Sequence, residues 1–209
     1  MIMNDLKIWM TGARSKLGKE LTKHLKVDST RFDITKEVPK LDFGLVIHAA
    51  AYTDVAMAEI NLNKCFLTNV NGTFNVVRTY KDTPFVYIST EYANHPLGVY
   101  AITKYLGEEV VRQFCQHYLI IRTLFKPTPW PFEFAYSDQY TQGDYVDVIA
   151  SLIVDKIKSW DRKTNESCLV GTGRKTIFEL AKKTRPDVQP NTVAEHRSKV
   201  GDIVPYDYE

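Results

Sequence analysis

A tyrosine and a lysine stand four residues apart in the stretch YAITKYLGEE, at Tyr100 and Lys104. Residues four apart lie on the same face of a helix, where their side chains can approach each other. The pKa of a tyrosine is ordinarily about 10, and a nearby ammonium lowers it by stabilising the phenolate. Such a pair could transfer a proton at neutral pH. This spacing also arises by chance, so its meaning depends on the surrounding elements.

A glycine-containing turn near the start of the chain could hold a phosphate. In MTGARSKLGKEL, a predicted strand is followed by Gly12 and then by a predicted helix, which is the setting of a dinucleotide-binding fingerprint. Gly12 is placed to make the tight turn, and Gly18 to let the helix pack closely on the sheet. Ser15 stands where a glycine normally lets the backbone approach a pyrophosphate. Its hydroxyl could cap the helix and face a phosphate, so the turn predicts a weakened dinucleotide site.

Three charged residues near this turn bear on the choice between NAD and NADP. Asp28 lies at the predicted end of the second strand. A carboxylate there can accept hydrogen bonds from the adenosine ribose and would repel a 2′-phosphate. Arg14 and Arg31 lie where they could instead neutralise that phosphate. The sequence therefore leaves NAD and NADP as alternatives.

Strands and helices that alternate through the first 125 residues must position these groups. Apolar runs predict strands, and apolar residues at helical spacing predict helices. We expect strands at 6–11, near Val27, at 44–50, 85–90 and 118–123, and helices at 15–25, 61–80 and 100–117. This alternation predicts an α/β fold with a doubly wound parallel sheet, whose ligands bind beyond the carboxyl ends of the strands.

The regular alternation ends at KPTPWPF (residues 126–132), where three prolines fall within five positions. The remainder contains an expected helix at 145–158, a shorter one at 177–183 and a polar tail. We therefore predict that residues 1–125 form a dinucleotide-binding domain. Residues 126–209 are predicted to form a small, truncated substrate-binding portion that is interleaved with the first domain.

The composition argues against several classes of protein. The formal net charge is +2, whereas a nucleic-acid-binding domain normally carries a basic patch and a much higher pI. Three widely spaced cysteines are not arranged as metal-ligand pairs, which favours reduced thiols in the cytoplasm. No apolar run approaches the roughly 20 residues that span a bilayer. The N-terminus lacks the pattern of a signal peptide. We expect a cytoplasmic protein without a nucleic-acid or membrane partner.

Six motifs follow one another in an order that resembles the extended short-chain dehydrogenase/reductases, and most closely the dTDP-4-dehydrorhamnose reductases. The motifs are TGARSKLGKEL, FDIT, HAAAYTDVAMAE, NVNGTFNV, YISTEY and PLGVYAITKYLGE. Their order and spacing are similar to the family over residues 6–125. A looser similarity follows at GDYVDVIASLI, residues 143–153.

The resemblance implies a Rossmann-like fold and an NAD(P)-dependent oxidoreductase. The implied reaction is reduction of the 4-keto group of a 6-deoxy nucleotide sugar by NADPH or NADH. It would serve the synthesis of activated deoxysugars such as dTDP-rhamnose, and of glycans. The implied partners are a dTDP-, UDP- or GDP-linked sugar and a second copy of the chain in a homodimer.

The resemblance also implies roles for individual residues. Tyr100 would donate the proton, while Lys104 would lower its pKa and bind the nicotinamide ribose. Thr90 would orient the substrate carbonyl; Ser89 is the alternative hydroxyl, but strand alternation points the two in opposite directions. Asn69 would anchor the active-site water and the lysine. The implied cofactor-binding residues are Gly12, Arg14, Ser15, Lys16, Leu17, Gly18, Asp28, Arg31, Asp33, Ile34, Ala49, Ala50, Ala51, Tyr52, Tyr100 and Lys104.

Substrate-side residues follow from the same resemblance. They are Thr53, Val55, Thr90, Glu91, Tyr92 and Phe125. Glu91 stands where the family has an aspartate, and Phe125 where it has a tryptophan, so the indole hydrogen-bond donor is lost. The run of alanines after His48 lets backbone and cofactor approach closely. His48 itself lies in a buried strand and is expected to be a core histidine.

Two alternatives remain open from the sequence. One is a non-catalytic NAD(P)-binding regulatory protein similar to the β subunit of methionine adenosyltransferase, favoured by Ser15 and by the shortened substrate side. The other is a nucleotide-sugar epimerase or dehydratase of the same superfamily. An epimerase would use the same tyrosine and lysine, and a dehydratase would usually add an acidic pair, of which Glu91 is the one candidate.

Overall fold

The structure is a computed structural model that describes residues 6–200, with side chains described for residues 6–196. Residues 1–5 and 201–209, the outer ends of the two predicted domains, lie outside the described residues. Within residues 6–200, no helix combines the length and the apolar character needed to cross a membrane.

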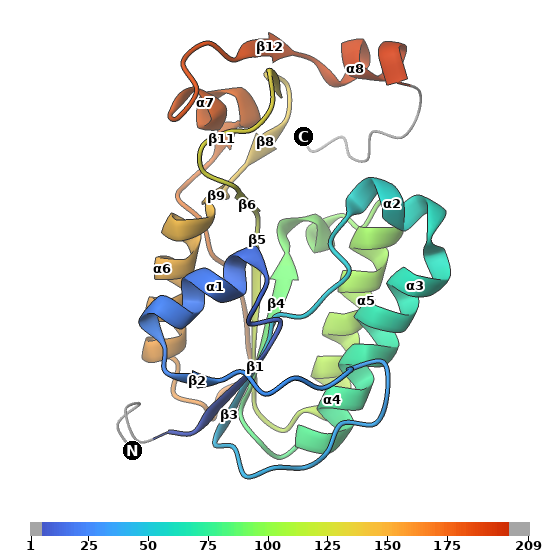
Figure 1. Cartoon of the computed structure of the whole chain (residues 1–209), viewed down its shortest axis with the longest axis vertical. Coiled ribbons are helices and arrows are strands. Elements are labelled where there is room, and N and C mark those ends of the chain that lie inside the picture. Colours follow the sequence, from blue (N-terminus) through green and yellow to red (C-terminus); the bar gives the residue numbers. More distant parts are fainter. Residues whose placement is uncertain (1–5, 201–209) are drawn as a thin grey trace.

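A six-stranded parallel sheet forms the centre of the molecule (Figure 1). In spatial order its strands are β10 (Glu166–Leu169), β5 (Tyr118–Thr123), β4 (Phe85–Thr90), β3 (Leu45–His48), β1 (Ile8–Thr11) and β2 (Val27–Asp28). Each adjacent pair is parallel. The chain places β2 on one side of β1 and β3 on the other, which makes a topological switch point at β1. The predicted α/β fold class is confirmed.

Helices cover both faces of this sheet (Figure 1). On one face lie α1 (Lys16–His24) and α6 (Val146–Ser159), and on the other α4 (Gly72–Tyr80) and α5 (Gly98–Phe114). Successive strand residues point their side chains into opposite cores. Ile8 and Met10 lie in the core under α1 and α6, and Trp9 lies in the core under α4 and α5. Because both faces are buried, the strands appear in the sequence as continuous apolar runs.

Two predicted helices differ in detail from the observed ones. The helix expected at 61–80 is made of α3 (Leu62–Phe66), the π-helical segment η2 (Leu67–Asn71) and α4. The helix expected at 100–117 is α5, which begins at Gly98 and ends at Phe114. It ends early because Cys115 adopts an extended backbone that leads into β5.

Two unpredicted elements, one helix and one strand, lie in the main body of the molecule. A short helix, α2 (Val55–Ile60), is capped by Asp54, whose side chain accepts a hydrogen bond from the Met57 backbone at 3.0 Å. The strand β10 forms the sheet edge beside β5. Its four residues alternate between partly buried and exposed, so they lack the apolar run that marks the central strands. Its strand conformation comes from pairing with β5.

The segment after residue 125 builds a small lobe beyond the carboxyl ends of the main strands (Figure 1). Its paired strands are β6 (Phe125–Lys126) with β9 (Asp144–Tyr145), β8 (Tyr140–Thr141) with β11 (Lys175–Thr176), and β7 (Phe134–Tyr136) with β12 (Gln189–Asn191). The predicted short helix is α7 (Ile177–Lys182), started by a capping box of Thr176 and Glu179. The predicted polar tail is corrected, because it contains β12 and α8 (Val193–Val200).

This lobe has its own apolar core and stays connected to the main sheet. The core residues are Trp130, Ala135, Ile177, Ala181 and Val188. Between its strands, the chain returns to the sheet as α6, which packs against α1, and as β10. The lobe is therefore connected to the main sheet by β5, which precedes it, and by α6 and β10, which lie between its strands in the sequence.

Candidate active site

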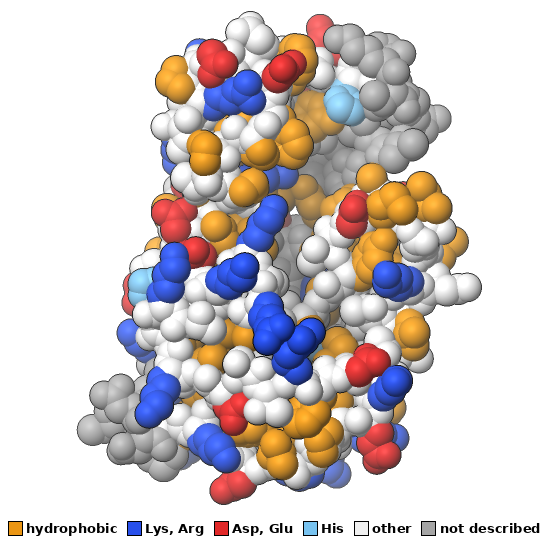
Figure 2. Space-filling view, in the orientation of Figure 1, with side chains coloured by type: hydrophobic (Ala, Val, Ile, Leu, Met, Phe, Trp, Pro, Cys, Tyr) orange, Lys and Arg blue, Asp and Glu red, His pale blue; other side chains and the backbone are white. Residues whose placement is uncertain are grey.

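A cleft of about 830 Å³ lies at the carboxyl ends of β1, β3, β4 and β5, and it extends to β6. Figure 2 shows a hollow between the small lobe and the body of the molecule. The sequence-predicted residues on the cleft wall are Gly12, Arg14, Ser15, Lys16, Leu17, Arg31, Asp33, Ile34, Ala49, Ala50, Ala51, Thr53, Val55, Thr90, Tyr92, Tyr100, Lys104 and Phe125. Five predicted residues are not on the wall: Gly18, Asp28, Tyr52, Asn69 and Glu91.

The turn after β1 has the predicted form. Gly12 has a φ of 73°, and a Cβ atom there would lie 2.7 Å from the carbonyl carbon of Ala49. Only glycine fits both the backbone angle and the contact. Ser15 caps α1, because its hydroxyl accepts a hydrogen bond from the Gly18 backbone at 2.9 Å. Gly18 lies under the turn, where a Cβ would collide with the Gly12 carbonyl oxygen.

Positive charge predominates on the cleft wall. The lining cations are Arg14, Lys16, Arg31, Lys104 and Lys126, and among the described lining residues Asp33 is the only carboxylate. Asp33 accepts hydrogen bonds from the backbone and side chain of Thr35, which lower its pKa. Figure 2 shows Lys and Arg side chains gathered on the same face as the hollow. A wall of this sign attracts an anionic ligand such as a phosphate.

Asp28 ends β2, as predicted, but it is not on the cleft wall. Its Oδ1 accepts hydrogen bonds from the Thr30 backbone at 2.8 Å and the Thr30 hydroxyl at 2.6 Å, and these bonds lower its pKa. This turn shapes the loop that brings Ser29, Thr30 and Arg31 to the cleft. The hydrogen bonds described for the Asp28 carboxylate stay within its own loop, and its contact with the adenosine ribose stays a prediction.

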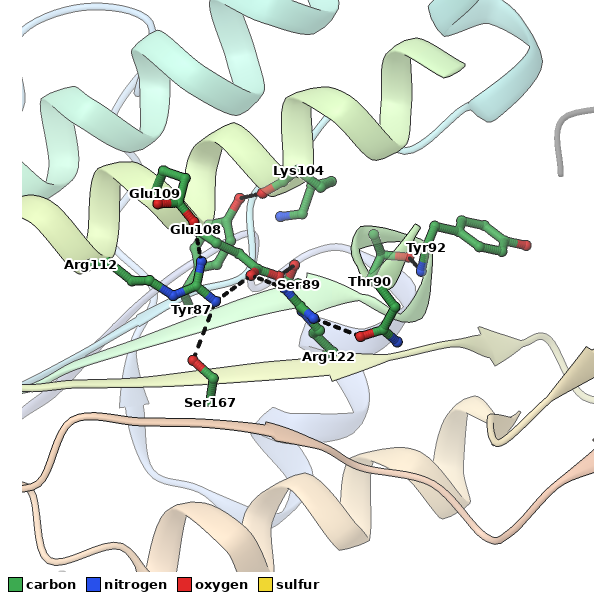
Figure 3. A network of polar contacts seen from close by, with 11 residues as sticks. Tyr87, Ser89, Thr90, Tyr92, Lys104, Glu108, Glu109, Arg112, Arg122 and Ser167 are labelled. Atoms are coloured by element: carbon green, nitrogen blue, oxygen red, sulfur yellow. Dashed lines mark hydrogen bonds and ion pairs between the residues drawn. The ribbon is translucent and has the colours of Figure 1, made fainter. Parts of the chain in front are cut away.

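Tyr100 and Lys104 on α5 and Thr90 at the end of β4 all face the cleft. The Thr90 hydroxyl caps the following 3₁₀ turn by accepting a hydrogen bond from the Tyr92 backbone at 3.3 Å. The Ser89 hydroxyl donates its hydrogen bond to Glu108 at 2.5 Å. Figure 3 shows Thr90 and Ser89 directed to different partners, as strand alternation predicts.

The pKa of Tyr100 is the reverse of the expectation from sequence. Burial raises it to about 12, and a hydrogen bond with the Thr90 side chain only partly opposes this. Lys104 donates a hydrogen bond to the Ile88 carbonyl at 2.8 Å, and its Nζ lies 4.1 Å from the centre of the Tyr87 ring. Burial lowers the pKa of Lys104 to about 7. The expected lowering of the Tyr100 pKa by Lys104 is absent, because burial has the largest influence on the phenol and Lys104 is not among the groups that shift its pKa.

Asn69 braces the loop after β3. Its Oδ1 accepts a hydrogen bond from the Tyr52 backbone at 2.7 Å, and its Nδ2 donates to the Thr103 hydroxyl at 3.0 Å. None of the hydrogen bonds described for this side chain reaches Lys104. The Asn69 side chain therefore links the loop to α5, and its predicted role of anchoring the active-site water and the lysine stays a prediction.

Two further predicted residues serve other contacts. Glu91 accepts hydrogen bonds from the Thr141 hydroxyl at 2.6 Å and the Gln142 backbone at 2.8 Å. It ties the end of β4 to the small lobe and does not line the cleft. The Tyr52 hydroxyl accepts a hydrogen bond from Asn61 at 3.5 Å, also away from the wall.

Glu108 is a buried residue that the sequence motifs did not single out. It follows Lys104 by four positions, so Tyr100, Lys104 and Glu108 share one face of α5. Its carboxylate accepts hydrogen bonds from Arg122, Arg112 and Ser89 (Figure 3). These bonds lower its pKa, while burial opposes them. The repeat of four after Lys104 was the signal available in the sequence.

His48 has the predicted core position. Burial lowers its pKa to about 3, so the ring is neutral. Its Nδ1 lies 2.7 Å from the Thr11 hydroxyl, which also accepts a hydrogen bond from the Ala50 backbone at 3.1 Å. Its Nε2 lies 3.1 Å from the Thr73 hydroxyl of α4. The ring thereby connects the alanine wall of the cleft to α4.

The described residues contain no group of three or more His, Cys, Asp or Glu side chains that could hold a metal ion. The residues do suit a dinucleotide. They provide a glycine turn at a helix start, a wall of small alanines and nearby cations that can face phosphates.

Comparison with known proteins gives relatives whose names refer to polysaccharide biosynthesis or to enzymes that act on nucleotide sugars. The chain is 29% identical to the spore coat polysaccharide biosynthesis protein SpsK of Bacillus subtilis, over 56% of this chain and 52% of that protein. It is 26% identical to a dTDP-4-dehydrorhamnose reductase of Aggregatibacter actinomycetemcomitans, over 56% of this chain and 50% of that one. The chain thus spans about half the length of these two relatives.

A solved structure supports the same fold. The dTDP-4-dehydrorhamnose reductase of Bacillus anthracis, in complex with NADP, superposes with a TM-score of 0.74 at 23% identity, covering 90% of this chain and 85% of that one. The family model described as the RmlD substrate binding domain matches residues 6–150. This match extends over most of the chain, from β1 into α6. The chain belongs to the RmlD substrate binding domain family.

Proposed function

We propose that this protein reduces the 4-keto group of a 6-deoxy nucleotide sugar, with NADPH or NADH as the reductant, in the manner of a dTDP-4-dehydrorhamnose reductase. The observation that carries the proposal is that Thr90, Tyr100 and Lys104 share one cleft with the Gly12 turn. The residues suited to proton transfer and the turn suited to a dinucleotide thus line the same cleft.

The dinucleotide would be held by the wall between β1 and β3. The turn from Gly12 to Ser15 would face its diphosphate, and the alanines after β3 would lie against its nicotinamide half. When bound, the reduced nicotinamide supplies a hydride. Arg14 and Arg31 on the cleft wall support NADPH over NADH, because guanidinium groups suit a 2′-phosphate. The ratio of the Kd values for the two cofactors tests this preference.

Residues of this chain would then handle the carbonyl and the proton. The Thr90 hydroxyl would donate a hydrogen bond to the carbonyl oxygen and orient it. Tyr100 would give its phenolic proton to the same oxygen as that oxygen gains negative charge. Burial raises its pKa to about 12, so the phenol is protonated at neutral pH, and the more basic alkoxide formed by hydride transfer is the group that takes the proton. Lys104 would orient the cofactor ribose and attract negative charge on the phenolate.

The test is a reductase assay with the purified chain. The protein is mixed with NADPH or NADH and a panel of dTDP-, UDP- and GDP-linked 4-keto-6-deoxy sugars, and loss of reduced-cofactor absorbance is followed. Tyr100→Phe should lower kcat about 10²- to 10⁴-fold. Tyr105→Phe is the matched control, since Tyr105 is exposed on the same helix and does not line the cleft.

Cofactor binding without turnover on any sugar of the panel would contradict the reductase and favour the regulatory function. Turnover that survives Tyr100→Phe at the wild-type rate would contradict the assigned proton donor.

We propose the cytoplasm as the location and a homodimer as the assembly. The three cysteines are free thiols, which supports a reducing compartment. Exposed apolar side chains on α5, among them Ile102 and Phe114, support contact with a second copy. Light scattering coupled to size-exclusion chromatography tests the dimer, and a monomer at micromolar concentration would contradict it.

A further inference from the structure

Lys126 lies close to the proposed chemistry and was not among the predicted site residues. Thr123 at the end of β5 pairs with Thr90 of β4, so the two strands end side by side. The chain continues through Phe125 into β6, and Lys126 lines the same cleft as Tyr100 and Lys104. Lys126 therefore belongs to the small-lobe side of the cleft.

Within residues 6–196, no anionic partner is described for the ammonium of Lys126. The side chain is half-buried, and burial lowers its pKa. Among the described residues, its one assigned contact is the Trp130 ring, whose centre lies 5.8 Å from Nζ. Removing a cation from water without a hydrogen-bonded partner is costly. The structure thus holds a partly desolvated positive charge at the cleft.

Two other lysines of the same lobe show the contrast. Lys175 donates hydrogen bonds to the carbonyls of Gly143 and Gly173 at 2.8 and 2.7 Å. Lys183 is paired with the Asp144 carboxylate at 2.9 Å. Both lysines satisfy contacts inside the lobe and neither lines the cleft. Of these three lysines, Lys126 is the one that lines the cleft and has no hydrogen bond described for its ammonium.

We propose that Lys126 binds a diphosphate group, and specifically the diphosphate of the nucleotide sugar; this rests on the proposed function. Both expected ligands carry a diphosphate. That of the dinucleotide belongs at the turn from Gly12 to Ser15, where α1 begins. Lys126 lies beyond β5, at the small-lobe side of the cleft, where the diphosphate of a bound nucleotide sugar would lie. An ammonium forms charge-assisted hydrogen bonds with phosphate oxygens and recognises them as a point charge.

One consequence concerns specificity. A contact with the diphosphate is independent of the base, so Lys126 would bind dTDP-, UDP- and GDP-linked sugars alike. It would also give nucleoside diphosphates a higher affinity than nucleosides, which lack the charged group.

Calorimetric binding to wild type, Lys126→Met and Lys126→Arg tests the proposal. The probes are thymidine, dTDP, UDP, GDP and NADPH, and no turnover is required. In Lys126→Met, binding of all three diphosphates should weaken about 10- to 100-fold. Thymidine and NADPH should bind with unchanged Kd, and Lys126→Arg should keep most of the affinity. Lys158→Met is the matched control, because Lys158 is exposed on α6 and lies off the cleft.

Three outcomes would overturn the proposal. They are unchanged diphosphate binding in Lys126→Met, an equal loss for thymidine, and a loss confined to NADPH, which would assign the lysine to the cofactor. The absence of diphosphate binding in the wild type would do the same. Wild-type dTDP binding that depends on Lys126, with no sugar reduced, would reject the proposed function and leave Lys126 supported. Turnover with the same KM in Lys126→Met would reject Lys126 and leave the function supported.

Discussion

The Glu108 carboxylate on α5 accepts two hydrogen bonds from the Arg122 guanidinium on β5, at 2.8 and 2.6 Å. Glu108 is fully buried, and Arg112 and Ser89 also donate to it. The carboxylate therefore joins α5 to β4 and β5 at the level of the cleft. Since Tyr100 and Lys104 lie on the same face of α5, this junction sets where they stand relative to the strand that carries Thr90.

Glu108→Gln should lower the free energy of unfolding by roughly 3–5 kcal/mol, because the charge that pairs with both arginines is lost from a buried site. Urea unfolding of the variant and the wild type measures the difference. Glu109→Gln is the control: Glu109 is exposed and pairs with Arg112 at 2.5 Å. Its loss should cost less than about 1 kcal/mol. Equal effects in the two variants would contradict a central role for Glu108.

Lys104 should make stability depend on alkaline pH. Its pKa is about 7 in the folded chain, against an ordinary value near 10.4 when unfolded. Between these values the unfolded chain binds more protons, so the free energy of unfolding rises with pH, by roughly 1.4 kcal/mol per unit. This contribution is complete above the unfolded pKa and is lost as the pH falls through the folded pKa.

Unfolding free energies of wild type and Lys104→Met from pH 7 to 10 measure this dependence. The wild type should gain stability relative to the variant over that range. Parallel curves would show that Lys104 keeps its charge when folded. Lys158→Met should follow the wild-type curve, because Lys158 is exposed.

Thr90→Val should lower kcat of the proposed reductase about 10²-fold, as expected for loss of one hydrogen bond to the developing oxyanion. Valine keeps the branched shape and removes only the hydroxyl. Thr90→Ser retains the hydroxyl and should recover most of the activity. Steady-state kinetics with NADPH and the keto sugar provide the measurement, and a similar loss in both variants would assign Thr90 a packing role.

Gly12→Ala should abolish NADPH binding and destabilise the chain by at least about 2 kcal/mol, because the left-handed backbone and the contact with Ala49 both disfavour a Cβ. Gly173→Ala is a matched control: its φ is 93°, and a Cβ there would meet no atom within 4 Å. It should cost about 1–2 kcal/mol and leave the cofactor Kd unchanged. Calorimetry and thermal unfolding measure both effects. Retained NADPH affinity in Gly12→Ala would contradict the assignment of this turn to the cofactor.

Local patterns in the sequence predicted five of the six strands of the central sheet, and the family resemblance supplied most of the cleft residues. Apolar runs identified the central strands, since both faces of the sheet are buried. Strand alternation separated Thr90 from Ser89, and helical spacing put Tyr100 and Lys104 on one face of α5. The Gly12 turn was predictable because a glycine between a predicted strand and a predicted helix indicates a tight turn.

The tertiary structure decided what depends on distant partners. Glu91 contacts Thr141 and Gln142, some 50 residues away, and Asn69 contacts Thr103. Neither contact could be predicted from the local motif. The pKa values of Tyr100 and Lys104 also depend on distant segments, because burial raised the first and lowered the second. Periodicity is a property of neighbours along the chain. Burial and hydrogen-bond partners are properties of the folded space, and they determined which side chains reach the cleft.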